Sequence, residues 1–185
     1  MSQLLIAGLG NVFRGDDAFG VEVVKRLAGR EFPPHVDVVD FGINGIDLVY
    51  ALLDRYDAAL LFDTFHRDGP PGSIYVIEPE FPDSDTAEPA GLMLTPHDLD
   101  PAQVLRMVHA MQGRCRRITL VGCEPGDFGD EWEGRMGCTD AVAAAVAVAA
   151  GMAARLVEKL SIGSGSEPDS GGGGDRRSCP IFEER

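Results

Sequence analysis

The stretch QLLIAGLGNVFRGDDAFGVEVVKRLAGR, residues 3–30, decides the fold of this chain. It opens with a short apolar run that ends at Gly8, and from Asp16 it carries the spacing of an amphipathic helix. A strand, a loop and a helix are therefore predicted in that order. The following segments repeat the alternation: VDVVDF (36–41) as a strand, GIDLVYALLDRY (45–56) as a helix and AALLFDTF (58–65) as a third strand.

Strands that are apolar on both faces and alternate with helices are typical of a mostly parallel sheet covered by helices on both sides. Three further segments continue the pattern: a helix at 100–112, a strand at 116–123 and a long helix from Thr139. The turn DGPPG (68–72) precedes SIYVIEP (73–79), which can return as an antiparallel edge strand. The predicted fold class is α/β, three-layer αβα, with a twisted sheet of about five strands.

The domain organisation follows from length and composition. A chain of 185 residues fits one domain, predicted at 1–160. Residues 161–185 are rich in glycine and serine and are predicted to form a flexible tail. Residues 80–96 have little periodicity and are predicted to form a long surface loop.

Charge and hydropathy exclude several classes of partner. Sixteen basic against thirty acidic residues give a net charge of −14. Such a surface repels nucleic-acid phosphates and anionic lipid headgroups, so neither nucleic acid nor membrane is expected as a partner. The longest apolar run, 141–154, is mostly alanine and shorter than the roughly 20 strongly apolar residues of a membrane-spanning helix.

The four cysteines show no CxxC pairing, and the N-terminal residues do not have the pattern of a secretory signal. We therefore expect reduced, structural thiols and a cytoplasmic location, although Cys123 and Cys138 could meet in the fold. The loop after the first strand, GLGN, does not predict dinucleotide binding. The third glycine of that fingerprint would fall at Phe13, and the chain has no phosphate-binding GxxxxGK[ST] loop.

Three residues are candidates for a metal site. Asp17 follows the first strand, Asp63 ends the third, and ligands of open parallel sheets bind beyond the carboxyl ends of the strands. His97 stands at the end of the 80–96 loop, from which it could reach the same edge. Two carboxylates and an imidazole suit nickel or zinc and leave positions open for other ligands.

Each candidate also has a structural interpretation. Asp16 and Asp17 could cap the following helix, and Asp63, like Asp40 at the end of the second strand, could be a turn residue. His97 could be a surface or capping residue. His66 is the reserve ligand, since it lies close to Asp63 in the chain, whereas His35 and His109 are weaker candidates.

The sequence resembles the hydrogenase maturation endopeptidases, which trim the C-terminus of the large subunit of nickel-iron hydrogenases. The likeness spans roughly Leu4 to Leu160. Its most specific blocks are GLGNVFRGDDAFGV (8–21) and GCEPGDFGDEWEGRMGCTDAVAAAV (122–146), with DFGINGIDL (40–48), LLFDTF (60–65) and LTPHDL (94–99) between them.

By that resemblance Asp17, Asp63 and His97 contact nickel, with Asp16 as the cap. The nickel is already installed in the large-subunit precursor, so it arrives with the substrate as the implied cofactor. The loop Gly42-Ile43-Asn44-Gly45 matches a family loop assigned to substrate processing, so Gly42, Asn44 and Gly45 are predicted to contact substrate. Isoleucine stands at position 43 where the family usually has threonine.

The expected function is thus an endopeptidase that recognises nickel in the precursor and removes its C-terminal extension. No Ser-His-Asp constellation or HExxH motif is present, and the catalytic nucleophile is left unassigned. Two alternatives stay open: a related metal-assisted peptidase with another substrate, and a non-catalytic nickel-dependent adaptor.

Overall fold

The computed structural model describes residues 2–79, 101–130 and 133–162. Its elements follow the predicted order, with boundaries that differ by a few residues. They are β1 (Leu4–Leu9), a 3-10 turn η1 (Gly15–Ala18), α1 (Phe19–Leu27), β2 (Val36–Gly42), α2 (Gly45–Asp54), β3 (Ala58–Thr64), β4 (Ile74–Ile77), α3 (Pro101–Ala110), β5 (Arg117–Cys123) and α4 (Asp140–Ile162).

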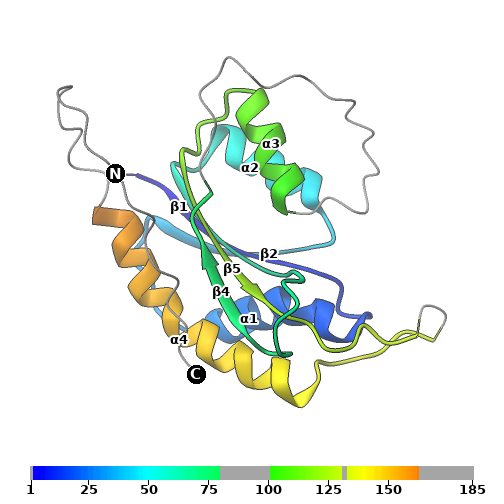
Figure 1. Cartoon of the computed structure of the whole chain (residues 1–185). Helices are drawn as coiled ribbons and strands as arrows, with labels where there is room; N and C mark the ends of the chain where they lie inside the picture. The colour runs from blue at the N-terminus through cyan, green and yellow to red at the C-terminus, as the bar shows by residue number, and fades with distance from the viewer. Residues whose placement is uncertain (1, 80–100, 131–132, 163–185) are drawn as a thin grey trace, which may run out of the picture.

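The strands form one sheet in the order β2-β1-β3-β5-β4. Strands β2, β1, β3 and β5 are parallel, and β4 pairs with β5 in the antiparallel direction at the edge. The prediction of a mostly parallel, five-stranded sheet with an antiparallel edge strand is confirmed. Figure 1 shows α1 and α4 on one face and α2 and α3 on the other, which makes the three layers.

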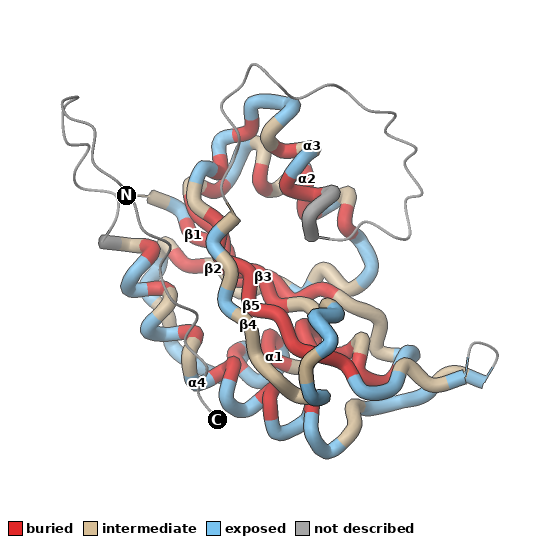
Figure 2. Tube along the Cα trace, in the orientation of Figure 1, coloured by how far each residue is buried: buried red, intermediate tan, exposed pale blue. Residues whose placement is uncertain are grey.

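Two apolar cores fill the spaces between these layers, and β1 supplies both because its side chains alternate. Leu4 and Ile6 face the core shared with α1 and α4, whereas Leu5 and Ala7 face the core shared with α2 and α3. All six residues of β1 are buried, and Figure 2 shows red tube along the centre of the sheet. Burial on both faces explains why the strands read as continuous apolar runs.

Helix α4 is long and apolar enough to cross a membrane by length and composition alone. In this fold it packs instead against α1 and the sheet, through a buried stripe of small residues and valines that includes Val142, Ala149 and Ala153. A stripe of this kind is typical of a core helix in a globular domain. The helix ends at Ile162, two residues beyond the domain boundary predicted from the sequence.

Two glycines let α1 approach the sheet closely, and this contact fixes the loop that carries Asp17. A Cβ on Gly20 would lie 2.1 Å from the carbonyl oxygen of Phe62 in β3 and 2.4 Å from that of Leu9 in β1. A Cβ on Gly8 would in turn lie 2.3 Å from the carbonyl oxygen of Gly20. The first turn of α1 therefore rests directly on the backbones of β1 and β3.

The substitution G20A should lower the free energy of unfolding by about 2–3 kcal/mol, because the added methyl meets backbone atoms that cannot rotate away. Urea denaturation measures this change. The matched control is G151A on α4, where a Cβ would meet no atom within 4 Å; it should raise stability by about 0.5–1 kcal/mol through helix propensity. A G20A protein as stable as the wild type would contradict the close packing.

Candidate functional site

The candidate site lies at the carboxyl ends of β1 and β3, which are neighbours in the sheet. The chain leaves β1 through α1 to reach β2 on one side, and then returns through α2 to β3 on the other side. The loops that follow β1 and β3 therefore diverge at this point. Such topological switch points are where open α/β sheets bind their ligands.

Asp17 is held at this switch point by groups from both strands. Its Oδ2 accepts a hydrogen bond from the backbone N–H of Asn11 at 3.1 Å, and its Oδ1 accepts one from Oγ1 of Thr64 at 3.2 Å. The side chain is partly buried. Gly10 has a φ of +123°, and a Cβ there would lie 1.8 Å from the carbonyl oxygen of Asp17. The position and orientation of this carboxylate are therefore set by the backbone after β1 together with the Thr64 hydroxyl at the end of β3.

Asp63 occupies the second-last position of β3, next to the threonine that contacts Asp17. One oxygen of Asp63, Oδ1, accepts a hydrogen bond from the N–H of Thr64 at 2.7 Å, although Asp63 lies within the strand and not in a turn. The side chain is partly buried. Asp17 and Asp63 thus share one edge of the sheet, as their positions predicted. His97, the third predicted ligand, lies outside the described residues.

The loop Gly42-Ile43-Asn44-Gly45 borders the same edge. The carbonyl oxygen of Gly42 accepts a hydrogen bond from the N–H of Gly10 at 2.9 Å, which ties this loop to the one before Asp17. Asn44 precedes the first residue of α2 but makes no side-chain capping bond, and it is exposed together with Ile43. The side chains of Ile43 and Asn44 are therefore available to a bound molecule, whereas Gly45 is buried.

Asp40 and His66 also have defined places. Asp40 is exposed, and its Oδ1 accepts a hydrogen bond from the N–H of Gly42 at 2.9 Å where the pairing of β1 with β2 shifts register. It lies within β2, two residues before the end of the strand, and holds the backbone of Gly42. His66, the reserve ligand, directs its Nδ1 toward Oε1 of Glu124 at 3.3 Å.

The prediction that Asp16 caps the following helix was wrong. Helix α1 begins at Phe19 without a side-chain capping bond, and Asp16 and Asp17 lie in the preceding η1 turn. Gly15 opens this turn with a φ of +53°, and the chain completes the 3-10 turn before the α-helix starts. The two carboxylates consequently point to different places.

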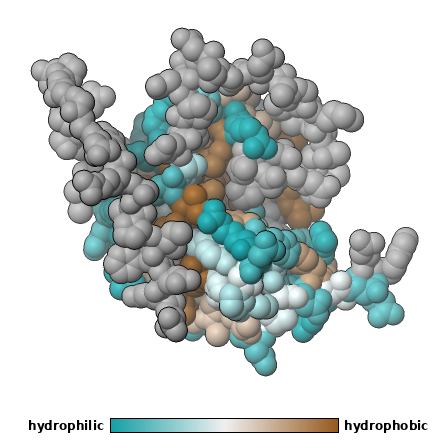
Figure 3. Space-filling model, viewed as in Figure 1, coloured by the Kyte–Doolittle hydropathy of each residue, from teal (hydrophilic) through white to brown (hydrophobic). Residues whose placement is uncertain are grey.

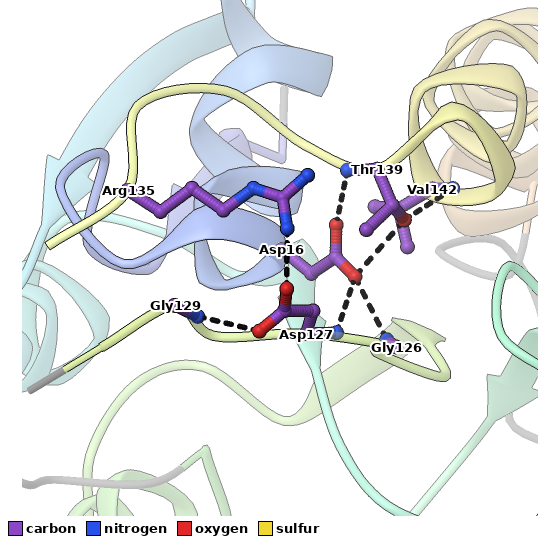
Figure 4. A network of polar contacts seen from close by, with 7 residues as sticks. All are labelled: Asp16, Gly126, Asp127, Gly129, Arg135, Thr139 and Val142. Atoms are coloured by element: carbon purple, nitrogen blue, oxygen red, sulfur yellow. Dashed lines mark hydrogen bonds and ion pairs between the residues drawn. The ribbon is translucent and has the colours of Figure 1, made fainter.

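Asp16 is fully buried and ties η1 to the segment between β5 and α4 (Figure 4). Its carboxylate accepts hydrogen bonds from the N–H groups of Gly126 at 2.8 Å and Asp127 at 2.9 Å, and from the N–H and hydroxyl of Thr139 at 2.6 and 3.0 Å. Burial opposes the charge, but these bonds prevail and hold the pKa of Asp16 below its ordinary value. Asp16 is a structural anchor.

A buried carboxylate that sequence reasoning missed stands at the end of β5. Oε2 of Glu124 accepts hydrogen bonds from the N–H of Arg67 at 2.8 Å and from the hydroxyl of Tyr75 at 3.1 Å. Burial opposes its charge, yet hydrogen bonds from Arg67, Gly69, Tyr75 and His66 hold its pKa below the ordinary value. The signal that could have found it is the one used for Asp63, an acid at the carboxyl end of a buried strand.

A pocket of about 540 Å³ adjoins this edge. Its walls are the loop after β1, with Phe13 and Arg14, and the segment after β5, with Phe128 and Asp130. The guanidinium of Arg14 lies over the ring of Phe128, 5.4 Å from its centre, and joins the two walls. The lining is both aromatic and charged, which suits a polar chain such as a peptide. Elsewhere on the molecule, hydrophilic residues gather across the middle of the face that Figure 3 shows.

The described cysteines do not supply a nucleophile. Cys115, Cys123 and Cys138 are free thiols, so Cys123 and Cys138 do not form the bond that their positions left open. Burial raises the pKa of Cys115 and Cys123 to about 12 and that of Cys138 to about 11. Thiols with such pKa values are inert at neutral pH.

Within the described ranges there is also no group of three or more His, Cys, Asp or Glu residues placed to hold a metal ion.

Comparison with known proteins decides the family. A family model described as hydrogenase maturation protease matches residues 21–156. The chain belongs to this family. Hydrogenase expression/formation protein HupD of Rhizobium leguminosarum bv. viciae is 28% identical over 169 residues, which cover 90% of this chain and 80% of HupD. The hydrogenase 2 maturation protease of Escherichia coli is 27% identical over 146 residues, or 78% of this chain and 84% of that protein.

Solved structures of peptidases share the fold. The solution structure of an endopeptidase from E. coli superposes with a TM-score of 0.68 at 25% identity, over 85% of this chain and 93% of that one. The hydrogenase 2 maturation peptidase from a Thaumarchaeota archaeon gives a TM-score of 0.61 at 26% identity, over 84% of this chain and 98% of that one. The predicted family, fold and endopeptidase activity are confirmed. The protein acts as a peptidase in hydrogenase maturation.

Proposed function

We propose that this endopeptidase recognises nickel in the precursor of a nickel-iron hydrogenase large subunit and removes the C-terminal extension of that precursor. The observation that carries the proposal is the meeting of Asp17 with the end of β3, where Asp63 stands, at the switch point of the sheet. Two carboxylates at a ligand-binding edge, one from the turn after β1 and one from the end of β3, suit the recognition of a cation.

Nickel enters this scheme as part of the substrate. Asp17 and Asp63 offer carboxylate oxygens, and His97 would add an imidazole nitrogen, a set that suits nickel and leaves positions for ligands of the precursor. Both oxygens of Asp17 accept one hydrogen bond each, which orients the carboxylate while each oxygen keeps a lone pair for a metal. Contact with the metal would hold the scissile peptide bond in a fixed place, which by itself accelerates cleavage.

The surroundings of the carboxylates supply the contact area for the substrate chain. The loop of Gly42, Asn44 and Gly45 would lie on one side of the bound peptide, with Asn44 free to hydrogen-bond to it. The pocket between the loops after β1 and β5 opens beside the same edge. The net charge of −14 favours a cationic metal centre and a basic extension on the precursor.

The test incubates the purified protein with its large-subunit precursor, loaded with nickel or free of it, and reads intact mass. We expect loss of a C-terminal peptide from the nickel-loaded precursor only, because without the metal the ligands lose most of their differential binding. Cleavage of both precursors at equal rates would keep the peptidase and refute nickel recognition. Binding without any loss of mass would favour the adaptor.

A further inference from the structure

Glu124 is a buried carboxylate that takes no part in the proposed recognition of nickel. It is 3% exposed and follows directly after β5 at the carboxyl edge of the sheet. Hydrogen bonds from the Arg67 N–H and the Tyr75 hydroxyl converge on one oxygen, Oε2. The other oxygen, Oε1, faces Nδ1 of His66 at 3.3 Å. A carboxylate held this firmly can fix the orientation of the ring that it faces.

His66 combines an anchored side with an open one. Its side chain is 66% exposed, and its ring meets the ring of Phe128 edge-on at a centroid distance of 5.6 Å. With Nδ1–H directed at the carboxylate, the neutral ring carries its lone pair on Nε2. Histidine rings that serve as bases in hydrolases are oriented by a carboxylate in the same way.

The turn that carries His66 is fixed to the sheet by its neighbour Phe65. The Phe65 N–H donates to the carbonyl oxygen of Cys123 at 3.2 Å, which extends the pairing of β3 with β5 beyond Thr64. The Phe65 ring covers Gly122, where an added Cβ would lie 1.8 Å from a ring carbon. The backbone therefore delivers His66 to this edge in one defined position.

His66 stands beside the candidate site. It is two residues beyond Thr64, whose hydroxyl contacts Asp17, so its backbone lies within about 7 Å of that of Thr64. Phe128, which the His66 ring touches, also lines the pocket and meets the guanidinium of Arg14. His66 is therefore between the carboxylate edge and the pocket wall, where a peptide bound along this edge would pass.

We propose that His66 is the proton-transfer residue of peptide cleavage and that Glu124 is its positioning residue. Nε2 of His66 takes a proton from water as the water oxygen bonds to the carbonyl carbon of the scissile peptide. The same nitrogen then returns that proton to the amide nitrogen, the C–N bond breaks, and an acid and an amine leave. The assignment rests on the peptide cleavage in the proposed function and not on its dependence on nickel.

The test compares H66Q with wild type in a steady-state assay on the nickel-loaded precursor. Glutamine can still donate a hydrogen bond to Glu124, but it cannot carry a proton between water and the amide. We expect kcat to fall by about 100-fold or more while KM stays within about threefold. The matched control is H35Q. His35 directly precedes β2, at the amino ends of the strands and so at the opposite end of the sheet from the site, and H35Q should keep wild-type kcat.

Two further measurements separate catalysis from structure. Added imidazole should restore part of the activity of H66A, because the site is open to solvent, and should leave H35Q unchanged. E124Q should reduce kcat about 10-fold or more in the wild-type background. In the H66Q background it should have no further effect, because Glu124 acts through His66.

A kcat of H66Q within threefold of wild type would overturn the assignment, as would an E124Q effect that persists in the H66Q background. The dependence of cleavage on nickel is tested separately from the role of His66. Equal cleavage of nickel-free precursor would refute nickel recognition while the comparison of H66Q with wild type stays decisive. Precursor left uncut by wild type in both forms would refute both proposals.

Discussion

The D17N protein will process nickel-loaded precursor at least about 100-fold more slowly than wild type, a loss of about 2.7 kcal/mol of transition-state stabilisation. Asparagine keeps the size of the side chain, and its single oxygen can still accept from Thr64 or from the Asn11 N–H. It loses the charge and one of the two oxygens that a cation would contact. The rate of mass loss from the precursor measures the effect.

The matched control for D17N is D40N. Asp40 is an exposed aspartate near the end of β2, and its Oδ1 accepts a hydrogen bond from the Gly42 N–H that an asparagine oxygen can also accept. Its cleavage rate should equal that of wild type. The exchange H97A should abolish cleavage if His97 is the third ligand, and unchanged cleavage would remove it from the site. A D17N protein that matches D40N would show that this carboxylate does not contact the metal.

The largest effect on stability is expected for D16A, at about 3–5 kcal/mol, because it removes a buried carboxylate and leaves three partly buried backbone N–H groups and one hydroxyl without their acceptor. Urea denaturation followed by circular dichroism measures it. The control is R135Q, which removes an exposed ion pair with Asp127 in the same network and should cost less than about 1 kcal/mol. A D16A protein no less stable than R135Q would contradict the anchoring role.

The contribution of Asp16 also has a defined pH dependence. The pKa of Asp16 is lower in the folded chain than its ordinary value of 3.8, so the unfolded chain binds the proton more tightly. The stabilisation is therefore fully present above that ordinary value and is lost as the pH falls through the lower folded pKa. The gap in stability between wild type and D16A should narrow under acid conditions and stay constant near neutral pH.

Local patterns in the sequence determined the elements, the layers and the sheet of this protein. Apolar runs such as LLIAG after Gln3 mark strands buried on both faces, and the turn before β4 permits its antiparallel return. Because the carboxyl ends of parallel strands lie at one edge of the sheet, the sequence also predicted that Asp17 and Asp63 lie together. These inferences depend only on the periodicity of the chain and on the handedness of its connections.

Only the tertiary structure decided what each acid does. Asp16 and Asp17 are adjacent in the chain and identical in type, but the 3-10 turn sends one into the core, to segments more than 100 residues away, and the other to the edge. Glu124 gained its role in the same way, through partners on β4 and on the turn after β3. Such contacts join residues that are distant in sequence, and no local pattern records them. The sequence therefore determined where the polar edge would form, and long-range packing determined which carboxylates are buried anchors and which can meet a substrate.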